Sequence, residues 1–216
     1  MANQAITGIP ELDMKIINEL SDYNLVRFCQ TNTYVNSLCK SDYLWQERIK
    51  DRYGQVQPKP QNITWQEYYF VIPYYQPTVV LKTFRQLIQN ANYPILQILI
   101  KIGFFETIGS MAIFMNRLDI FEGLFQRGSF QLTPDEERII TNLAVGNGRI
   151  NFLDWLAAHG FYPGPEAMII AIRSKQLPAV QWLHAHGYQV PPEAFPAGRV
   201  VGTEEIREWL EEQGAI

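Results

Sequence analysis

The sequence has few charged residues, few cysteines and no long apolar run. Charged residues make up 19% of the 216 residues, below the usual share of about 25%. The formal charge of −4 argues against a strongly basic nucleic-acid-binding protein. The hydrophobic share of 47% excludes intrinsic disorder. Gln97 and Lys101 interrupt the longest apolar run, 95–105, which is shorter than the ~20 residues that a membrane-spanning helix needs.

Cys29 and Cys39 are the only cysteines, too few for a secreted disulfide scaffold. Neither has a Cys-x-x-Cys partner or a histidine close in sequence, so we expect two buried, reduced thiols. The first residues show neither the basic segment nor the apolar stretch of a signal peptide. We therefore expect a soluble, intracellular protein without a membrane partner.

Motifs that carry chemistry are also missing. The sequence contains no Gly-Lys-Ser/Thr phosphate loop, no His-Glu-x-x-His and no Gly-x-Ser-x-Gly. His184 and His186 are two residues apart, so on a helix they point in different directions and do not easily share a metal ion. We expect no catalytic residue, no metal site and no cofactor.

Strand signals are nearly absent, and the apolar residues recur at helical spacing. Between Ile9 and Trp45 they follow the i, i+3, i+4 rule in short runs. Pro10 suits the first position of a helix, and Ser21 suits an N-cap. We predict three short helices, followed by a fourth that carries Trp45 and stops at Gly54.

Residues 55–78 have the composition of a connector. Pro58 and Pro60 open the segment, Pro73 and Pro77 close it, and an aromatic helix is expected over 65–70. Such a helix is more often a joint between two units than a binding site.

An internal repeat begins near residue 79. Trp155, Trp182 and Trp209 lie 27 residues apart, and each is followed five residues later by a glycine. Two apolar places, seven and four residues before the glycine, fit five successive frames. They are Leu96, Phe121, Leu153, Val180 and Ile206, then Leu99, Leu124, Leu156, Leu183 and Leu210.

Each frame predicts a helical hairpin. The two apolar places share one helical face, and the glycine suits a left-handed C-cap. A turn about eleven residues before the glycine separates the two helices, for instance at Gly146–Gly148. One hairpin cannot bury its apolar face alone, so we expect about five to stack into an α-solenoid. Five glutamates against Arg207 give the last fourteen residues an acidic, solvated face.

The frame from Ala171 through Trp182 and Leu183 to Gly187 resembles the ankyrin repeat, and 144–160 fits as well. The resemblance covers residues 80–216. The period is 27 residues rather than the usual ~33, and no Thr-Pro-Leu-His opens a repeat. The missing residues fall where an ankyrin repeat has its β-hairpin finger. We therefore expect short loops and little or no β-structure.

The N-terminal segment resembles an F-box. That family's fixed spacing is met by Ile9-Pro10, Glu11-Leu12, Ile16-Ile17, Leu20, Asn24-Leu25, Phe28, Leu38 and Trp45. The chain departs from the pattern in three ways: one residue is missing after Pro10, Thr31-Asn32 replaces Val-Cys, and Val35 replaces an inner tryptophan.

Together these patterns predict an all-α chain with an F-box-like domain at 8–54, an aromatic connector at 55–78 and an ankyrin-like repeat domain at 79–216. This combination resembles proteins of large DNA viruses, and residues 30–34 are similar to the giant-virus variety. The resemblance implies a viral protein of the host cytoplasm or nucleus.

The F-box resemblance implies a non-catalytic substrate adaptor of a Skp–cullin–F-box ubiquitin ligase. The head would bind the Skp-type linker protein, and the repeats would bind a target protein of unknown identity. The alternative is a non-ubiquitin scaffold or virion component that uses the same modules for protein–protein contact. The expected linker-binding residues are Ile9, Pro10, Leu12, Ile16, Ile17, Leu20, Leu25, Phe28, Leu38 and Trp45. The expected target-binding residues are Asn116, Arg117, Asn147, Arg149, Arg173, Lys175 and Gln176.

Overall fold

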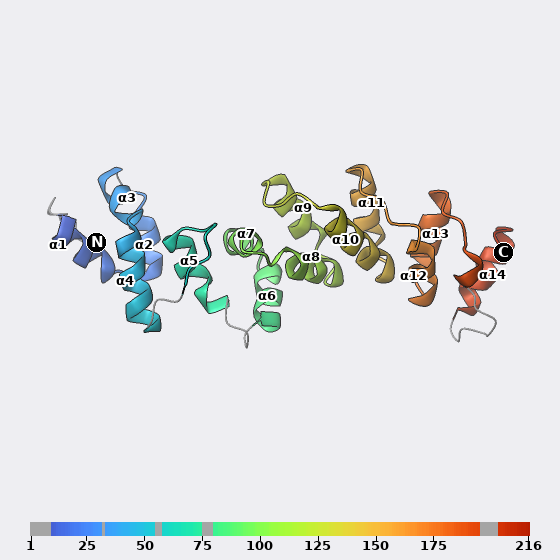
Figure 1. The fold of residues 1–216 in the computed structure, drawn as a ribbon, viewed down its shortest axis with the longest axis horizontal. Coiled ribbons are helices and arrows are strands. Elements are labelled where there is room, and N and C mark those ends of the chain that lie inside the picture. The colour runs from blue at the N-terminus through green and yellow to red at the C-terminus, as the bar shows by residue number, and fades with distance from the viewer. Residues whose placement is uncertain (1–9, 32, 55–57, 75–79, 195–202) are drawn as a thin grey trace. The chain divides into compact units, whose positions relative to one another are not determined.

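The computed structural model describes residues 10–31, 33–54, 58–74, 80–194 and 203–216 (Figure 1). Side-chain surroundings are described from Leu12 in the first of these ranges and from Thr83 in the fourth. In these ranges the regular structure is fourteen α-helices and two 3-10 helices, without a strand. The prediction of an all-α fold is confirmed. Two compact units divide the chain, Met1–Val80 and Leu81–Ile216.

The first unit consists of short helices, and the three helix ends that the sequence predicts, at Pro10, Ser21 and Gly54, are found there. Ser21 accepts a hydrogen bond from the backbone N–H of Asn24, and Gly54 ends the fourth helix with a φ of +84°. The elements are α1 (Pro10–Asn18), α2 (Asp22–Phe28), α3 (Thr33–Cys39), α4 (Asp42–Tyr53), α5 (Trp65–Val71) and the 3-10 helix η1 (Ile72–Tyr74).

The aromatic helix α5 packs on α4 within the first unit. The Trp45 ring lies 5.4 Å from the ring of Tyr69 and 5.6 Å from that of Phe70, between centroids. A capping box formed by Thr64 and Glu67 starts α5. The separate connector at 55–78 stays a prediction, because part of it lies outside the described residues.

The second unit is a series of helix pairs. Four pairs are described completely: α6 (Val80–Gln89) with α7 (Tyr93–Lys101), α8 (Phe105–Phe114) with α9 (Leu118–Gln126), α10 (Pro134–Gly146) with α11 (Ile150–Ala158), and α12 (Ala167–Arg173) with α13 (Leu177–Ala185). The 3-10 helix η2 (Pro192–Ala194) and α14 (Glu204–Glu212) follow. The first helix expected in the fifth hairpin falls largely on 195–202, outside the described residues.

A glycine in the left-handed conformation ends the second helix of each hairpin, as the 27-residue frame predicts. Gly160 has a φ of +83°, and the N–H of Phe161 donates to the carbonyl of Leu156 at 2.9 Å. This backward bond is the Schellman motif, which satisfies a carbonyl that the helix end leaves free. The same glycine and the same bond recur at Gly103, Gly128, Gly187 and Gly214.

The first helices end in the same way, but mostly without glycine. Lys175 has a φ of +59°, and the next N–H, that of Gln176, donates to the carbonyl of Ala171 at 2.9 Å. A left-handed residue other than glycine costs roughly 1–2 kcal/mol. The other three described hairpins turn at Ala91, Asn116 and Gly148.

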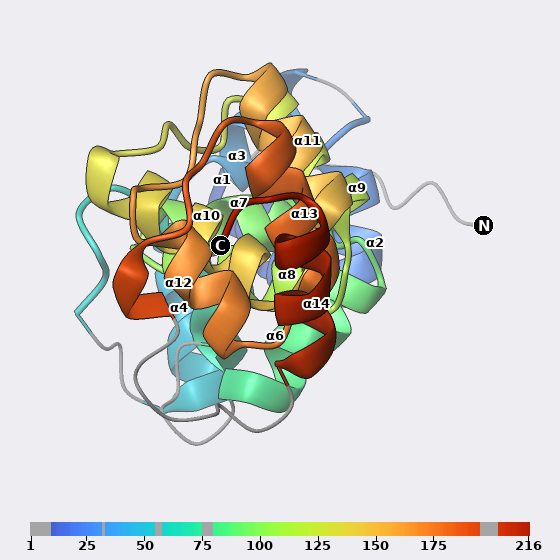
Figure 2. The same cartoon turned by 90° about the vertical axis from the view of Figure 1, so that its right-hand side faces the viewer.

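Neighbouring hairpins pack mainly through like helices, and α7 also contacts α8 of the next hairpin. Among first helices α8 contacts α10 and α10 contacts α12, while among second helices α7 contacts α9, α11 contacts α13 and α13 contacts α14. Figure 2 views the second unit from its C-terminal end, so that α12, α13 and α14 are nearest the viewer. All ten apolar frame positions named in the sequence analysis are buried, none of them more than 3% exposed.

Gly160→Ala should lower the free energy of unfolding by about 1 kcal/mol, because alanine resists a positive φ. No atom lies within 4 Å of an added Cβ, so the cost is conformational rather than steric. Gly146→Ala is the matched control: Gly146 is helical and its Cβ would meet only ordinary contacts at 3.5 Å. This control should gain about 0.5–1 kcal/mol. Urea unfolding followed by far-ultraviolet circular dichroism measures both changes, and equal shifts would refute the left-handed cap.

Candidate functional site

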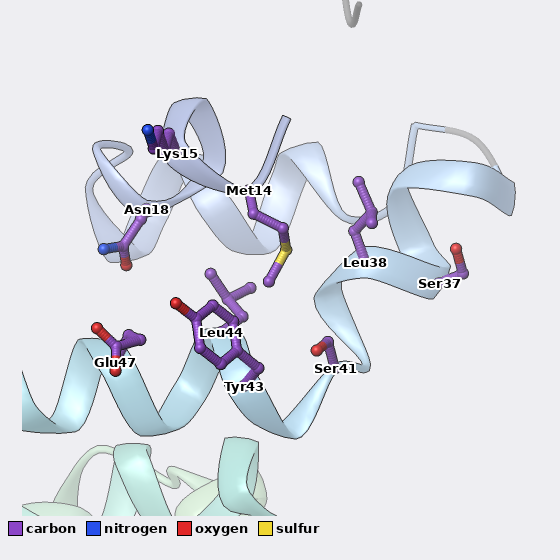
Figure 3. Close-up of a pocket in the computed structure, with 9 residues that line it drawn as sticks. All are labelled: Met14, Lys15, Asn18, Ser37, Leu38, Ser41, Tyr43, Leu44 and Glu47. Atoms are coloured by element: carbon purple, nitrogen blue, oxygen red, sulfur yellow. The ribbon is translucent and has the colours of Figure 1, made fainter. Parts of the chain in front are cut away.

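A groove of about 730 Å³ opens on the first unit between α1, α3 and α4 (Figure 3). Its volume lies within the roughly 300–1,000 Å³ that is typical of binding sites in proteins. The lining side chains are Met14, Lys15 and Asn18 from α1, Ser37 and Leu38 from α3, and Ser41, Tyr43, Leu44 and Glu47 from the start of α4.

The centre of the groove is apolar and its two ends are polar. Figure 3 shows Met14 and Tyr43 pointing toward one another over Leu44. Asn18 and Glu47 lie at one end, while Ser37 and Ser41 lie at the other. Tyr43 is 64% exposed. An apolar strip with polar ends suits an amphipathic segment of another protein.

Arg48 of α4 fixes the position of α1. Its guanidinium donates to the main-chain carbonyls of Asn18 and Leu20, both at 2.9 Å, and to Asp22, also at 2.9 Å. These carbonyls lie at and just after the end of α1, where the helix leaves acceptors without an internal partner. Arg48 is only 8% exposed. One side chain therefore satisfies the end of α1 and holds this wall of the groove against α4.

Asp22 is the anion of the same network. Its carboxylate accepts hydrogen bonds from Arg48, Arg52 and the hydroxyl of Tyr69. Partial burial favours a higher pKa for Asp22, but the bonds from Tyr69, Arg52 and Arg48 outweigh it. The pKa of Asp22 therefore lies below its ordinary value of 3.8. This network links α2, α4 and α5.

Three contacts hold α3 in place. The hydroxyl of Tyr34 donates to Asp13 of α1 at 2.8 Å, and the indole Nε1 of Trp45 donates to the carbonyl of Cys39 at 2.6 Å. Cys39 is also bonded to Cys29 in a disulfide that joins the ends of α2 and α3. The expectation of two reduced thiols was therefore wrong. Their sequence separation of 10 gave no pairing signal, because only the turn between two short helices brings the Cα atoms to 5.8 Å.

The expected linker-binding residues divide by burial. Leu12 is 45% exposed, whereas Ile17, Leu25 and Trp45 are at most 1% exposed and belong to the core of the first unit. Of those whose side chains are described, only Leu38 lines the groove. Ile16, Leu20 and Phe28 are half-buried, and Ile9 and the side chain of Pro10 lie outside the described residues.

Sequence reasoning missed most of the groove. Met14, Tyr43 and Glu47 stand outside the F-box pattern, and no short motif connects them. They meet because α1, α3 and α4 converge at this point. The exposure of Tyr43 is the one signal that points to the groove, and it can be read only from the folded structure.

Two of the expected target-binding residues hold neighbouring hairpins together. Arg149 donates to the carbonyls of Ile113 at 3.1 Å and Phe114 at 2.7 Å, at the end of α8. Arg117 donates to the carbonyls of Ile88 and Gln89 at the end of α6. Arg117 and Arg149 hold the same place in the frame, eleven residues before the glycine that ends the hairpin. These guanidinium groups therefore satisfy main-chain carbonyls of the preceding hairpin.

The other expected target-binding residues lie at the turns, where some side chains are hydrogen-bonded to the main chain and others are exposed. The side-chain amides of Asn147 and Gln176 donate to the nearby carbonyls of Leu143 and Ser174. Asn116, Arg173 and Lys175 are exposed. Solvent-facing side chains therefore stand at two of the turns, Asn116 between α8 and α9, and Arg173 and Lys175 at the turn from α12 to α13.

A ring stack repeats on the second helices. His159 lies 3.9 Å from Trp155, and His186 lies 3.7 Å from Trp182, between ring centroids. Each histidine Nδ1 lies 2.7 Å from the carbonyl of its tryptophan. Trp182 also donates to Asp154 of the preceding hairpin at 2.7 Å. The histidines thus belong to the repeated architecture, and the described residues gather no set of three or more suited to hold a metal ion.

Arg149→Met should lower the free energy of unfolding by about 1.5–3 kcal/mol, because it leaves two carbonyls at the end of α8 without their charged donor. Arg173→Met is the matched control, since Arg173 is exposed on α12 and should change stability by less than about 0.5 kcal/mol. Urea unfolding measures both variants. Equal stability of the two would contradict the bridging role of Arg149.

The stability of the first unit should fall in acid through Asp22. Because the folded pKa is depressed, this contribution is present above an unfolded pKa of about 3.9. It is lost as the pH falls through the folded pKa. Asp22→Asn should be less stable at pH 7 and should lose less stability between about pH 5 and pH 2. Thermal unfolding across this range compares it with Glu19→Gln, which removes an exposed carboxylate of the same unit. A parent-like acid slope in Asp22→Asn would contradict the assignment.

No family model, no curated protein and no solved structure matches the chain. The F-box and ankyrin resemblances therefore rest on the residue patterns. No helix within the described ranges has both the length and the apolar character needed to cross a bilayer.

Proposed function

We propose that the chain is a non-catalytic adaptor of a Skp–cullin–F-box ubiquitin ligase. Helices α1–α4 bind the Skp-type linker protein, and the hairpins of the second unit bind a target protein. The chain acts by proximity, because it raises the effective concentration of target lysines near the ubiquitin-conjugating enzyme. No residue of the chain forms or breaks a bond in this proposal.

The observation that carries the proposal is the apolar surface left uncovered on a very small unit. Leu12 and Tyr43 are 45% and 64% exposed, and Met14 and Leu38 are only half-buried in the groove. Large apolar side chains beside a groove are typical of a protein–protein contact. This surface lies in the segment that follows the F-box spacing.

The target side of the proposal rests on the turns between the paired helices. Asn116 faces solvent at the turn of one hairpin, and Arg173 and Lys175 face solvent at the turn of another, whereas the apolar frame positions repeat in both. Variation on a constant frame is what recognition of a particular partner requires. Arg117 and Arg149 have a structural role and contribute to this surface only by fixing its shape.

A second candidate is the scaffold or virion component. The observation that favours it is the Cys29–Cys39 disulfide, because lasting disulfides belong to oxidising environments such as a virion surface. In this case the same groove binds a structural partner instead of a ligase.

Replacing Leu12 by Glu should reduce capture of the linker and cullin from a eukaryotic lysate by about tenfold or more, which corresponds to ~1.4 kcal/mol of lost binding. The cause is an unpaired carboxylate placed against an apolar partner surface. Leu12 is already 45% exposed, so the helices should stay folded. Leu38→Glu tests the groove itself in the same way.

Val26→Glu is the matched control, because Val26 is 40% exposed on α2 and does not line the groove. It should capture the linker as the parent does. Ile17→Lys is unsuitable, since Ile17 is a core residue and its change tests folding. Full capture by Leu12→Glu and Leu38→Glu would overturn this docking surface. No capture by the parent, together with abundance in purified virus particles, would support the scaffold.

A further inference from the structure

Helices α2 and α3 are too short to be stable without outside anchors. Each has seven residues, whereas isolated helices below ~12–15 residues are marginal in water. Leu25 is the only buried side chain of α2, and Val35 and Cys39 are the only buried side chains of α3. One of the two buried side chains of α3 is therefore a cysteine of the disulfide.

The disulfide lies beside the groove wall. Cys39 directly follows Leu38, which with Ser37 forms the side of the groove that α3 provides (Figure 3). Its other end, Cys29, caps the C-terminus of α2. Without the bond, α3 keeps Val35, the Tyr34–Asp13 hydrogen bond and the Trp45 bond to the Cys39 carbonyl.

Reduction of this bond needs only an external thiol. Cys29 is half-buried and Cys39 is 2% exposed, so the sulfur of Cys29 is the reachable one. A thiolate of a dithiol reductant attacks the sulfur of Cys29, forms a mixed disulfide with it and releases Cys39 as a thiolate that takes up a proton. The second thiol of the reductant then displaces Cys29. Two electrons and two protons pass to the chain, and the reductant ends as its own disulfide.

We propose that the Cys29–Cys39 disulfide is a redox switch for docking. The oxidised chain holds α3 in place and keeps the groove formed, and reduction leaves α3 with only Val35 and two hydrogen bonds, so that this wall opens more readily. The inference rests on the proposed docking function of α1–α4, whose regulation it names. Disulfides that form inside a cell are usually transient and are either catalytic or redox-sensing.

The test compares the full chain in air with the same chain in dithiothreitol. Hydrogen exchange of 33–39 should speed up by about tenfold or more on reduction, since a local opening becomes easier when the loop between the cysteines is no longer closed. Exchange of 93–101 in the second unit should stay unchanged and is the internal control. Capture of the Skp-type linker should fall in parallel.

A Cys29→Ser/Cys39→Ser variant should behave as the reduced chain does and should not respond to dithiothreitol. Uptake of iodoacetamide by both cysteines of the air-oxidised parent would show that the bond does not form and would sink the proposal. Equal exchange of 33–39 in both states overturns it as well. Exchange that depends on the disulfide without linker capture in either state supports the switch and overturns the docking function. Linker capture that is present and equally strong in both states overturns the switch alone.

Discussion

Every α-helix in the described part of the chain is too short to be stable alone, and the rest of the structure follows from that constraint. The helices run from seven to thirteen residues, a length at which nucleation is costly and the unsatisfied end groups are a large share of the backbone. In the second unit, a residue with a left-handed backbone conformation follows each helix of the four described hairpins. The resulting backward hydrogen bonds satisfy end carbonyls and turn the chain onto its neighbour.

The first unit meets the same constraint with side chains. Arg48 satisfies the carbonyls at the end of α1, and Asp22 holds that guanidinium in place. Trp45 packs against the rings of α5 while its indole binds the end of α3. Core, helix ends and groove walls therefore share the same few residues, and a change in one of them alters the others.

The sequence allowed prediction of what depends on local pattern. The glycine frame located the second helices, and Ser21 and Gly54 marked helix ends correctly. What depends on contacts distant in sequence was missed. Arg149 looks like a free surface charge until α8 lies beside it, and the cysteines looked unpaired until α2 and α3 met. The groove was missed for the same reason, since its walls come from three helices.

The bridges from Arg117 and Arg149 have a consequence for how such a chain changes over generations. Their acceptors are main-chain carbonyls, which are present whatever side chains the preceding hairpin carries. A hairpin with this arginine therefore accepts any predecessor whose first helix ends in the same left-handed turn. Duplication of either of these two hairpins leaves this junction chemistry intact, while the outward side chains are free to diverge. In the two hairpins that carry this arginine, one charged residue thus separates the inheritance of the architecture from the inheritance of its surface.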